Sequence, residues 1–91
     1  MIPVVYTPIA EKYKNLKKLY KDAITNIRVN PLIGDAKTGD LKGIYSLDIR
    51  YNRTNYELTY RISHLDNGDI LVVIMAGTRK NFYKELKRYM K

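Results

Sequence analysis

Two segments in the middle of the chain alternate between apolar and polar residues. The alternation runs through residues 45–51 and again through residues 56–62. This period of two is typical of strands with one buried face. A third, continuous apolar run covers residues 70–76, after a turn at residues 66–69. The pattern predicts a three-stranded antiparallel meander with one apolar face and one polar, partly basic face. Its predicted core residues are Tyr45, Leu47, Ile49, Leu58, Tyr60, Ile62 and Val72.

Helical periodicity precedes the meander. Between Pro8 and Val29, apolar residues recur at steps of three and four, the spacing of one face of an amphipathic helix. The helix is expected to end at Asn30-Pro31, because a residue before proline is disfavoured in the helical conformation. We expect one long helix, with a kink or break near Asn15 as the alternative, followed by a loop at residues 32–40.

The two ends of the chain complete the predicted fold. Residues 3–6 form a short apolar run that can add a fourth strand, and the helical period returns after Thr78. The predicted order is β-α-β-β-β-α, an α+β fold in which residues 1–91 form one domain. Both helices are expected to pack on the apolar face of the antiparallel sheet.

The chain is strongly basic, with 17 Lys and Arg residues against 9 Asp and Glu residues and a net charge of +8. Such a charge favours nucleic acid, an acidic protein or a membrane surface as partner, although it can also serve solubility alone. Lysines on the outer faces of the predicted helices are either simply solvated or able to contact RNA phosphates. These lysines are Lys12, Lys14, Lys17, Lys18, Lys21, Lys80 and Lys84.

Several kinds of site and location are disfavoured by the composition. The chain has no cysteine and one histidine, and it has no carboxylate cluster, so we expect neither a metal nor another cofactor. His64 falls on the inward parity of its strand, which favours a structural role. No segment approaches the roughly 20 apolar residues needed to cross a bilayer, and the first residues lack the features of a signal peptide. We expect a cytoplasmic protein without a membrane partner.

Charged residues gather on the polar face of the meander. Arg50, Glu57 and Arg61 share this face, Arg79 follows the last strand, and Tyr83 lies one helical turn later on the same side of its helix. These side chains could converge on a concave surface. The alternative is a solvated sheet face with cross-strand ion pairs, each contributing about 0.2–1 kcal/mol.

Short motifs occur in a definite order along the chain. L-x-G at residues 41–43 precedes the first alternating strand, and x-L-x-Y at residues 57–60 lies in the second. G-x-R at residues 77–79 closes the third strand, before a helix that carries Tyr83. Together with the chain length and the basic charge, this order resembles the RelE/ParE superfamily of toxins from bacterial and archaeal type II toxin–antitoxin modules.

The resemblance implies both a fold and a choice of functions. RelE-like toxins enter the ribosomal A site and cut mRNA without a metal, by attack of a 2′-hydroxyl on the adjacent phosphate. ParE-like toxins instead poison DNA gyrase without catalytic residues, and they usually carry a longer helical hairpin than residues 8–29 could form. A non-catalytic module that binds RNA or an acidic protein is the third alternative. For a toxin, the resemblance implies an acidic antitoxin as partner, and for the RelE-like branch also the ribosome and mRNA.

The resemblance also assigns candidate roles to residues. Arg50 and Arg79 match cationic site residues, and Tyr83 stands near the usual place of a C-terminal tyrosine. The sequence departs from the family at Glu57, where an arginine is typical. Either Arg61 replaces that cation, or Glu57 acts as general base, as a glutamate does in YoeB-like relatives. We therefore expect a metal-independent, ribosome-dependent mRNA endoribonuclease that uses these five residues.

Overall fold

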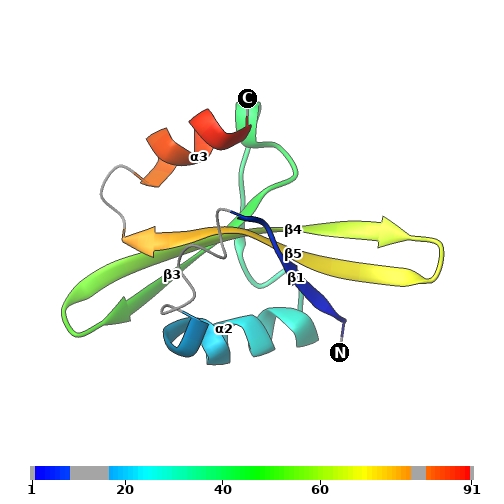
Figure 1. Cartoon of the computed structure of the whole chain (residues 1–91), viewed down its shortest axis with the longest axis horizontal. Helices are drawn as coiled ribbons and strands as arrows, with labels where there is room; N and C mark the ends of the chain where they lie inside the picture. Colours follow the sequence, from blue (N-terminus) through cyan, green and yellow to red (C-terminus); the bar gives the residue numbers. More distant parts are fainter. Residues whose placement is uncertain (1, 9–16, 79–81, 91) are drawn as a thin grey trace.

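The computed structural model contains a five-stranded sheet with a described helix against each face (Figure 1). It describes residues 2–8, 17–78 and 82–90. The strand order across the sheet is β1-β5-β4-β3-β2. The strands are β1 (Val4–Tyr6), β2 (Asp35–Ala36), β3 (Tyr45–Tyr51), β4 (Thr54–Leu65) and β5 (Gly68–Thr78), and the helices are α2 (Lys17–Val29), the short 3₁₀ helix η2 (Gly39–Leu41) and α3 (Phe82–Met90).

The antiparallel meander of β3, β4 and β5 is confirmed. In its first hairpin, Tyr51 pairs with Thr54, so the connection is a two-residue turn rather than the four residues 52–55 that separate the two alternating segments. Both turn residues, Asn52 and Arg53, have positive φ angles, of 49° and 64°. These angles are those of a type I′ turn, whose twist matches that of the flanking strands. The tighter turn starts β4 two residues earlier than the alternation indicates.

The continuous apolar run belongs to β5, which lies between β1 and β4 inside the sheet. The strand β1 was expected to join the sheet, and it pairs in parallel with β5. Because both faces of β5 are covered, every residue from Leu71 to Gly77 is buried. A strand buried on both faces is typically apolar throughout, without alternation. A β-bulge at Ile74 shifts the pairing with β4 and lets Ile74 and Met75 both pack on the same side.

The two helices cover opposite faces of the sheet, so the expectation that both pack on one apolar face is wrong (Figure 1). The reason lies in β5, whose second face is as apolar as the first and also requires burial. The core under α2 contains Tyr20, Ile24, Ile27, Leu58, Tyr60, Leu71, Val73 and Ala76, and the core under α3 contains Leu41, Ile44, Val72, Ile74, Met75, Phe82 and Leu86.

The predicted core residues follow this division. Leu58 and Tyr60 are fully buried under α2. Four further predicted residues are partly buried and pack against the same core, namely Tyr45, Leu47, Ile49 and Ile62. Val72 is buried as predicted, but it belongs to the core under α3.

The remaining expectations concern the helices and the loop before the meander. The expectation of one long helix, or of a break near Asn15, falls on residues 9–16, which lie outside the described residues. The predicted loop at residues 32–40 contains the short strand β2, which pairs with Tyr45 and Ser46 of β3. Among the described helices, none is long and apolar enough to cross a membrane.

Candidate functional site

The polar face of β4 is covered by α3 where Glu57 lies. The side chain of Glu57 is only 1% exposed, and its neighbour on the same face, Thr59, is fully buried. The alternative of a solvated sheet face is therefore wrong at this position. In the described part of the chain, no buried side-chain nitrogen or oxygen lacks a hydrogen-bond partner. A carboxyl group is costly to bury unless it is hydrogen-bonded, so the groups that bond to Glu57 are what allow it to lie here.

Glu57 is bonded to Tyr83, which lies in the first turn of α3. The Tyr83 hydroxyl donates a hydrogen bond of 2.6 Å to Glu57 Oε2, and the Tyr83 side chain is half-buried. The preceding residue, Phe82, is almost fully buried and meets the Tyr83 ring edge to face at 5.3 Å. Phe82 thus anchors the start of α3 on the sheet and sets the direction of Tyr83.

The backbone of Glu57 is held from the opposite side of the sheet. The hydroxyl of Tyr20, on α2, donates to the carbonyl oxygens of Glu57 at 3.0 Å and of Gly77 at 3.3 Å. Burial raises the pKa of Tyr20 far above its ordinary value, so the hydroxyl keeps the proton that it donates. Helix α2 therefore contributes to the position of a carboxyl group that lies under α3.

A cation comes from the segment after β2. The backbone N–H of Lys37 donates to the carbonyl of Ile44 at 2.8 Å, and Lys37 Nζ lies 5.0 Å from the centre of the Tyr83 ring. A hydrogen bond to Tyr83 raises the pKa of Lys37, and the charges of Glu57 and Asp35 act in the same direction, whereas burial opposes them. Lys37 is thus positively charged throughout the physiological pH range. We call Lys37, Glu57 and Tyr83 the polar cluster.

Sequence reasoning had not identified Lys37 as a site residue. The residue lies in the segment that was predicted to be a loop, and it belongs to no motif or periodic pattern. Only the pairing of β2 with β3 brings it to the polar cluster, and a strand of two residues leaves no readable alternation. The presence of one lysine in a short segment before the meander was the only available signal.

Of the other candidate catalytic residues, Arg50 lies near Glu57, whereas Arg61 does not. Arg50 is exposed and pairs with Asn55, so Glu57 is its diagonal neighbour on the sheet, within reach of a long side chain. Arg61 lies four residues along β4 from Glu57, or about 13 Å, and donates to Ser63 Oγ at 2.5 Å. The structure therefore does not bring Arg61 to the polar cluster. Arg79 lies outside the described residues.

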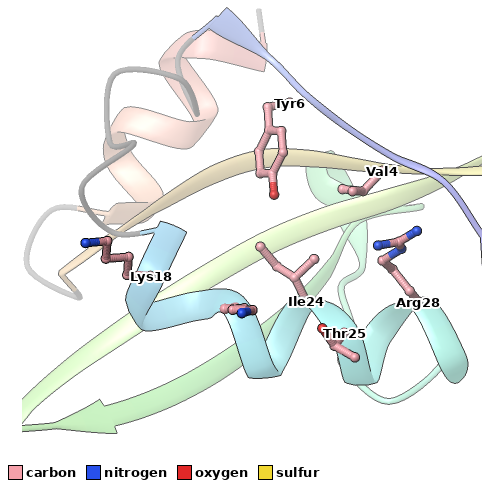
Figure 2. A pocket seen from close by; sticks show the side chains of 7 residues that line it. Val4, Tyr6, Lys18, Ile24, Thr25 and Arg28 are labelled. Carbon is pink, nitrogen blue, oxygen red and sulfur yellow. The ribbon is translucent and has the colours of Figure 1, made fainter.

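The predicted RNA-binding lysines fall on two faces. Lys18 and Lys21 are exposed and, together with Arg28, line an open groove of about 370 Å³ between β1 and α2 (Figure 2). Arg28 lies at one end of this groove, and its Nε donates to the carbonyl of Ile2 at 2.6 Å. Lys84 is exposed on α3, on the side of the sheet that carries the polar cluster. Lys12, Lys14 and Lys80 lie outside the described residues, as does the side chain of Lys17, the first residue of α2.

His64 lies far from the polar cluster, towards the end of the hairpin formed by β4 and β5. Its side chain is 79% exposed, and Nδ1 lies 2.8 Å from Asp69 Oδ1 on the neighbouring strand. The expected inward position is wrong, since the hairpin extends beyond the cores at this point (Figure 1). Within the described ranges, no three histidine or carboxylate side chains are grouped so that they could hold a metal ion.

Comparison with known proteins places the chain in a family. The family model of the ParE-like toxins of type II bacterial toxin–antitoxin systems matches residues 5–87. A search of curated proteins gave no significant match. The structure is similar to a YoeB/ParE toxin from Agrobacterium tumefaciens, with a TM-score of 0.65 and 21% identity over 86% of this chain and 99% of that one. It is equally similar to an arginine double mutant of the E. coli toxin RelE in the free state, with a TM-score of 0.65 and 18% identity over 96% of each chain. The chain belongs to the ParE-like toxins of type II toxin–antitoxin systems.

Proposed function

We propose that this toxin inhibits translation by cutting mRNA on the ribosome, with the polar cluster as its reaction centre. The observation that carries the proposal is the 2.6 Å hydrogen bond from Tyr83 to the buried Glu57, with the Lys37 ammonium group beside the same tyrosine ring. A tyrosine between a carboxylate and a fixed cation can both accept and pass on a proton. The reaction class, transesterification through the 2′-hydroxyl, is taken from the resemblance to RelE-like toxins.

The proposed reaction begins with proton transfer through Tyr83. The 2′-hydroxyl of the RNA gives its proton to the Tyr83 oxygen, while the Tyr83 proton passes to Glu57 Oε2. The 2′-oxygen then forms a bond to the adjacent phosphorus, and the bond from phosphorus to the 5′-oxygen breaks. The products are a 2′,3′-cyclic phosphate and a 5′-hydroxyl, which takes its proton from solvent. Because Glu57 is almost fully buried, it acts on the RNA only through Tyr83.

The cations of the site stabilise the charge that develops on the phosphate. Lys37 remains protonated at physiological pH, so it serves as a fixed positive charge rather than as an acid. The exposed Arg50 adds a second cation on the same face of the sheet. Charge stabilisation by preorganised cations is commonly the largest single contribution to such reactions.

Single-turnover cleavage of mRNA on programmed ribosomes tests this proposal. Tyr83→Phe removes the hydroxyl but keeps the ring, and we expect a loss of about a hundredfold or more in the cleavage rate. Lys37→Met keeps the length of the side chain but removes its charge, and we expect a similar loss. Arg61→Ala is the matched control, because it removes a cation from the same strand at a distance from the polar cluster. Wild-type rates in both Tyr83→Phe and Lys37→Met would refute the reaction centre.

Gyrase poisoning is the second candidate, because the matching family is described as ParE-like. In this case the toxin would act on DNA gyrase and would need no proton transfer at Tyr83. Purified gyrase, incubated with the toxin and supercoiled plasmid, distinguishes the two functions. Double-strand breaks in the plasmid, together with intact mRNA on the ribosome, would replace the proposed endoribonuclease by a gyrase poison.

A further inference from the structure

Tyr60 is a buried tyrosine whose hydroxyl ties a distant segment of the chain to the sheet. It lies on β4, on the face covered by α2. Its hydroxyl donates to the carbonyl of Pro31 at 2.8 Å and accepts the backbone N–H of Gly34 at 2.9 Å. The Tyr60 ring is stacked on that of Tyr45, with ring centres 5.4 Å apart. Both hydrogen bonds of this hydroxyl therefore go to one short stretch of backbone after α2.

From this anchor the chain passes around the edge of the sheet. Asp35 and Ala36 pair with β3, and the next residue, Lys37, bonds to Ile44 through its backbone N–H. Lys37 then reaches Tyr83 on α3, which covers the face opposite to that of Tyr60. Figure 1 shows the chain leaving α2 on one side of the sheet and reaching the α3 side on the other. We call residues 31–37 the edge strap, since they connect the two faces.

The close approach at the start of the edge strap requires glycine. A Cβ atom at Gly34 would lie 2.7 Å from the Tyr60 hydroxyl oxygen and 2.9 Å from the backbone oxygen of Ser46. Real Cβ atoms essentially never show contacts this short, and the Ser46 oxygen belongs to the sheet, so it cannot move aside cheaply. Any other residue at position 34 would therefore push the edge strap away from β3.

We propose that Tyr60 and Gly34 are positioning residues that hold Lys37 over Tyr83, from the opposite face of the sheet. Only Asp35 and Ala36 separate Gly34 from Lys37, and both are paired with β3. A displacement of Gly34 should therefore displace Lys37 as well. The effect on RNA cleavage rests on the proposed function, whereas the effect on the position of Lys37 does not. Neither residue contacts the reacting atoms.

The first test measures the position of Lys37 directly. Protons above an aromatic ring have shifted NMR resonances, so the protons of the Lys37 methylene group next to Nζ should be displaced from their usual values in the full-length toxin. Tyr60→Phe removes the hydroxyl and Gly34→Ala creates the clash, and we expect both to move these resonances back towards ordinary values. Tyr83→Phe keeps the ring and shows whether the ring alone, without its hydroxyl, holds the lysine.

A control separates positioning from general loss of stability. Ile27→Val removes one methyl group from the same core but no hydrogen bond of the edge strap, so its Lys37 resonances should keep their wild-type shifts. Urea unfolding confirms which variants remain folded. A folded Tyr60→Phe variant with wild-type Lys37 resonances would overturn the inference, and so would an equal displacement in Ile27→Val.

The second test uses single-turnover cleavage in a double-mutant cycle. Tyr60→Phe should slow cleavage by about tenfold to a hundredfold, the range expected for a misplaced catalytic group. If Tyr60 acts through Lys37, the Tyr60→Phe substitution should have little further effect in a Lys37→Met background. Independent, multiplicative losses would contradict positioning through Lys37. If the wild type cuts no RNA but Tyr60→Phe still displaces the Lys37 resonances, the positioning inference stands and the proposed function fails.

Discussion

At the scale of single residues, Tyr20 couples protonation most directly to folding. Its pKa is raised by burial, and its hydroxyl holds the backbone of Glu57. In the unfolded chain Tyr20 ionises at its ordinary value of about 10, whereas the folded chain keeps it neutral to higher pH. The unfolded state therefore loses its proton first, so the stability that neutral Tyr20 provides is complete below this value and is lost as pH rises above it.

The expected result is a steeper loss of stability at alkaline pH in the wild type than in Tyr20→Phe. Urea unfolding at a series of values between about pH 9 and 11 gives the free energy of unfolding and its slope with pH. Other groups with raised pKa values, such as Lys37 and Tyr60, remain in both proteins and contribute equally to both slopes. Identical slopes would show that the Tyr20 proton is not coupled to folding.

The composition of the polar cluster could be predicted only in part at this scale. Strand parity placed Glu57 on the correct face, and the family motifs pointed to Tyr83. The burial of Glu57 was not predicted, because nothing in the alternation of β4 reveals which element covers the polar positions of this strand. Lys37 lies far from both partners in sequence, and no local rule relates a loop lysine to a helix that begins after three further strands.

At the scale of elements, periodicity was informative where one face of a strand is buried. In β3, residues 47–50 follow the expected alternation, whereas Ser46 is buried, and in β4 the burial of Glu57 and Thr59 interrupts the alternation. The continuous apolar run of β5 is typical of a strand buried on both faces, but the prediction placed both helices on one face of the sheet. The short β2 could not be predicted, since its register depends on the anchoring of residues 31–34 by Tyr60.

The turn between β3 and β4 provides a test at the same scale. Arg53 adopts a φ angle of 64°, where a side chain is disfavoured and glycine is not. We expect Arg53→Gly to stabilise the hairpin by up to about 1 kcal/mol, measured by urea unfolding. Lys42→Gly is the matched control, because it also removes an exposed cation but at a φ angle of −56°, where glycine should destabilise. Equal effects of the two substitutions would contradict the importance of the turn geometry.

At the scale of the whole molecule, two separate basic surfaces lie on opposite faces of the sheet. The groove between β1 and α2 combines Lys18, Lys21 and Arg28 with apolar side chains (Figure 2). The polar cluster and Lys84 lie on the other face. A partner that binds in the groove therefore need not obstruct the proposed reaction centre, and variants can separate binding from chemistry.

The antitoxin expected for a type II toxin provides the test of this separation. We expect an acidic antitoxin, because a net charge of +8 attracts anionic proteins and accelerates their association at low salt. In the groove, the cations lie beside the apolar Val4 and Ile24, a combination suited to an acidic segment with apolar side chains. Lys18→Glu with Lys21→Glu should therefore slow association and also hasten dissociation.

The control carries the same change of charge on the other face. Lys84→Glu with Lys87→Glu replaces two exposed lysines of α3, so each double variant has a net charge of +4, which is +8 less two units for each substitution. Both variants should lose a similar part of the salt-dependent association rate, since long-range attraction depends on the total charge. Only the groove variant should dissociate faster, because only it loses direct contacts. Rapid-mixing measurements with the purified antitoxin over a range of salt concentrations give both rates, and equal dissociation rates would show that the groove is not the binding surface.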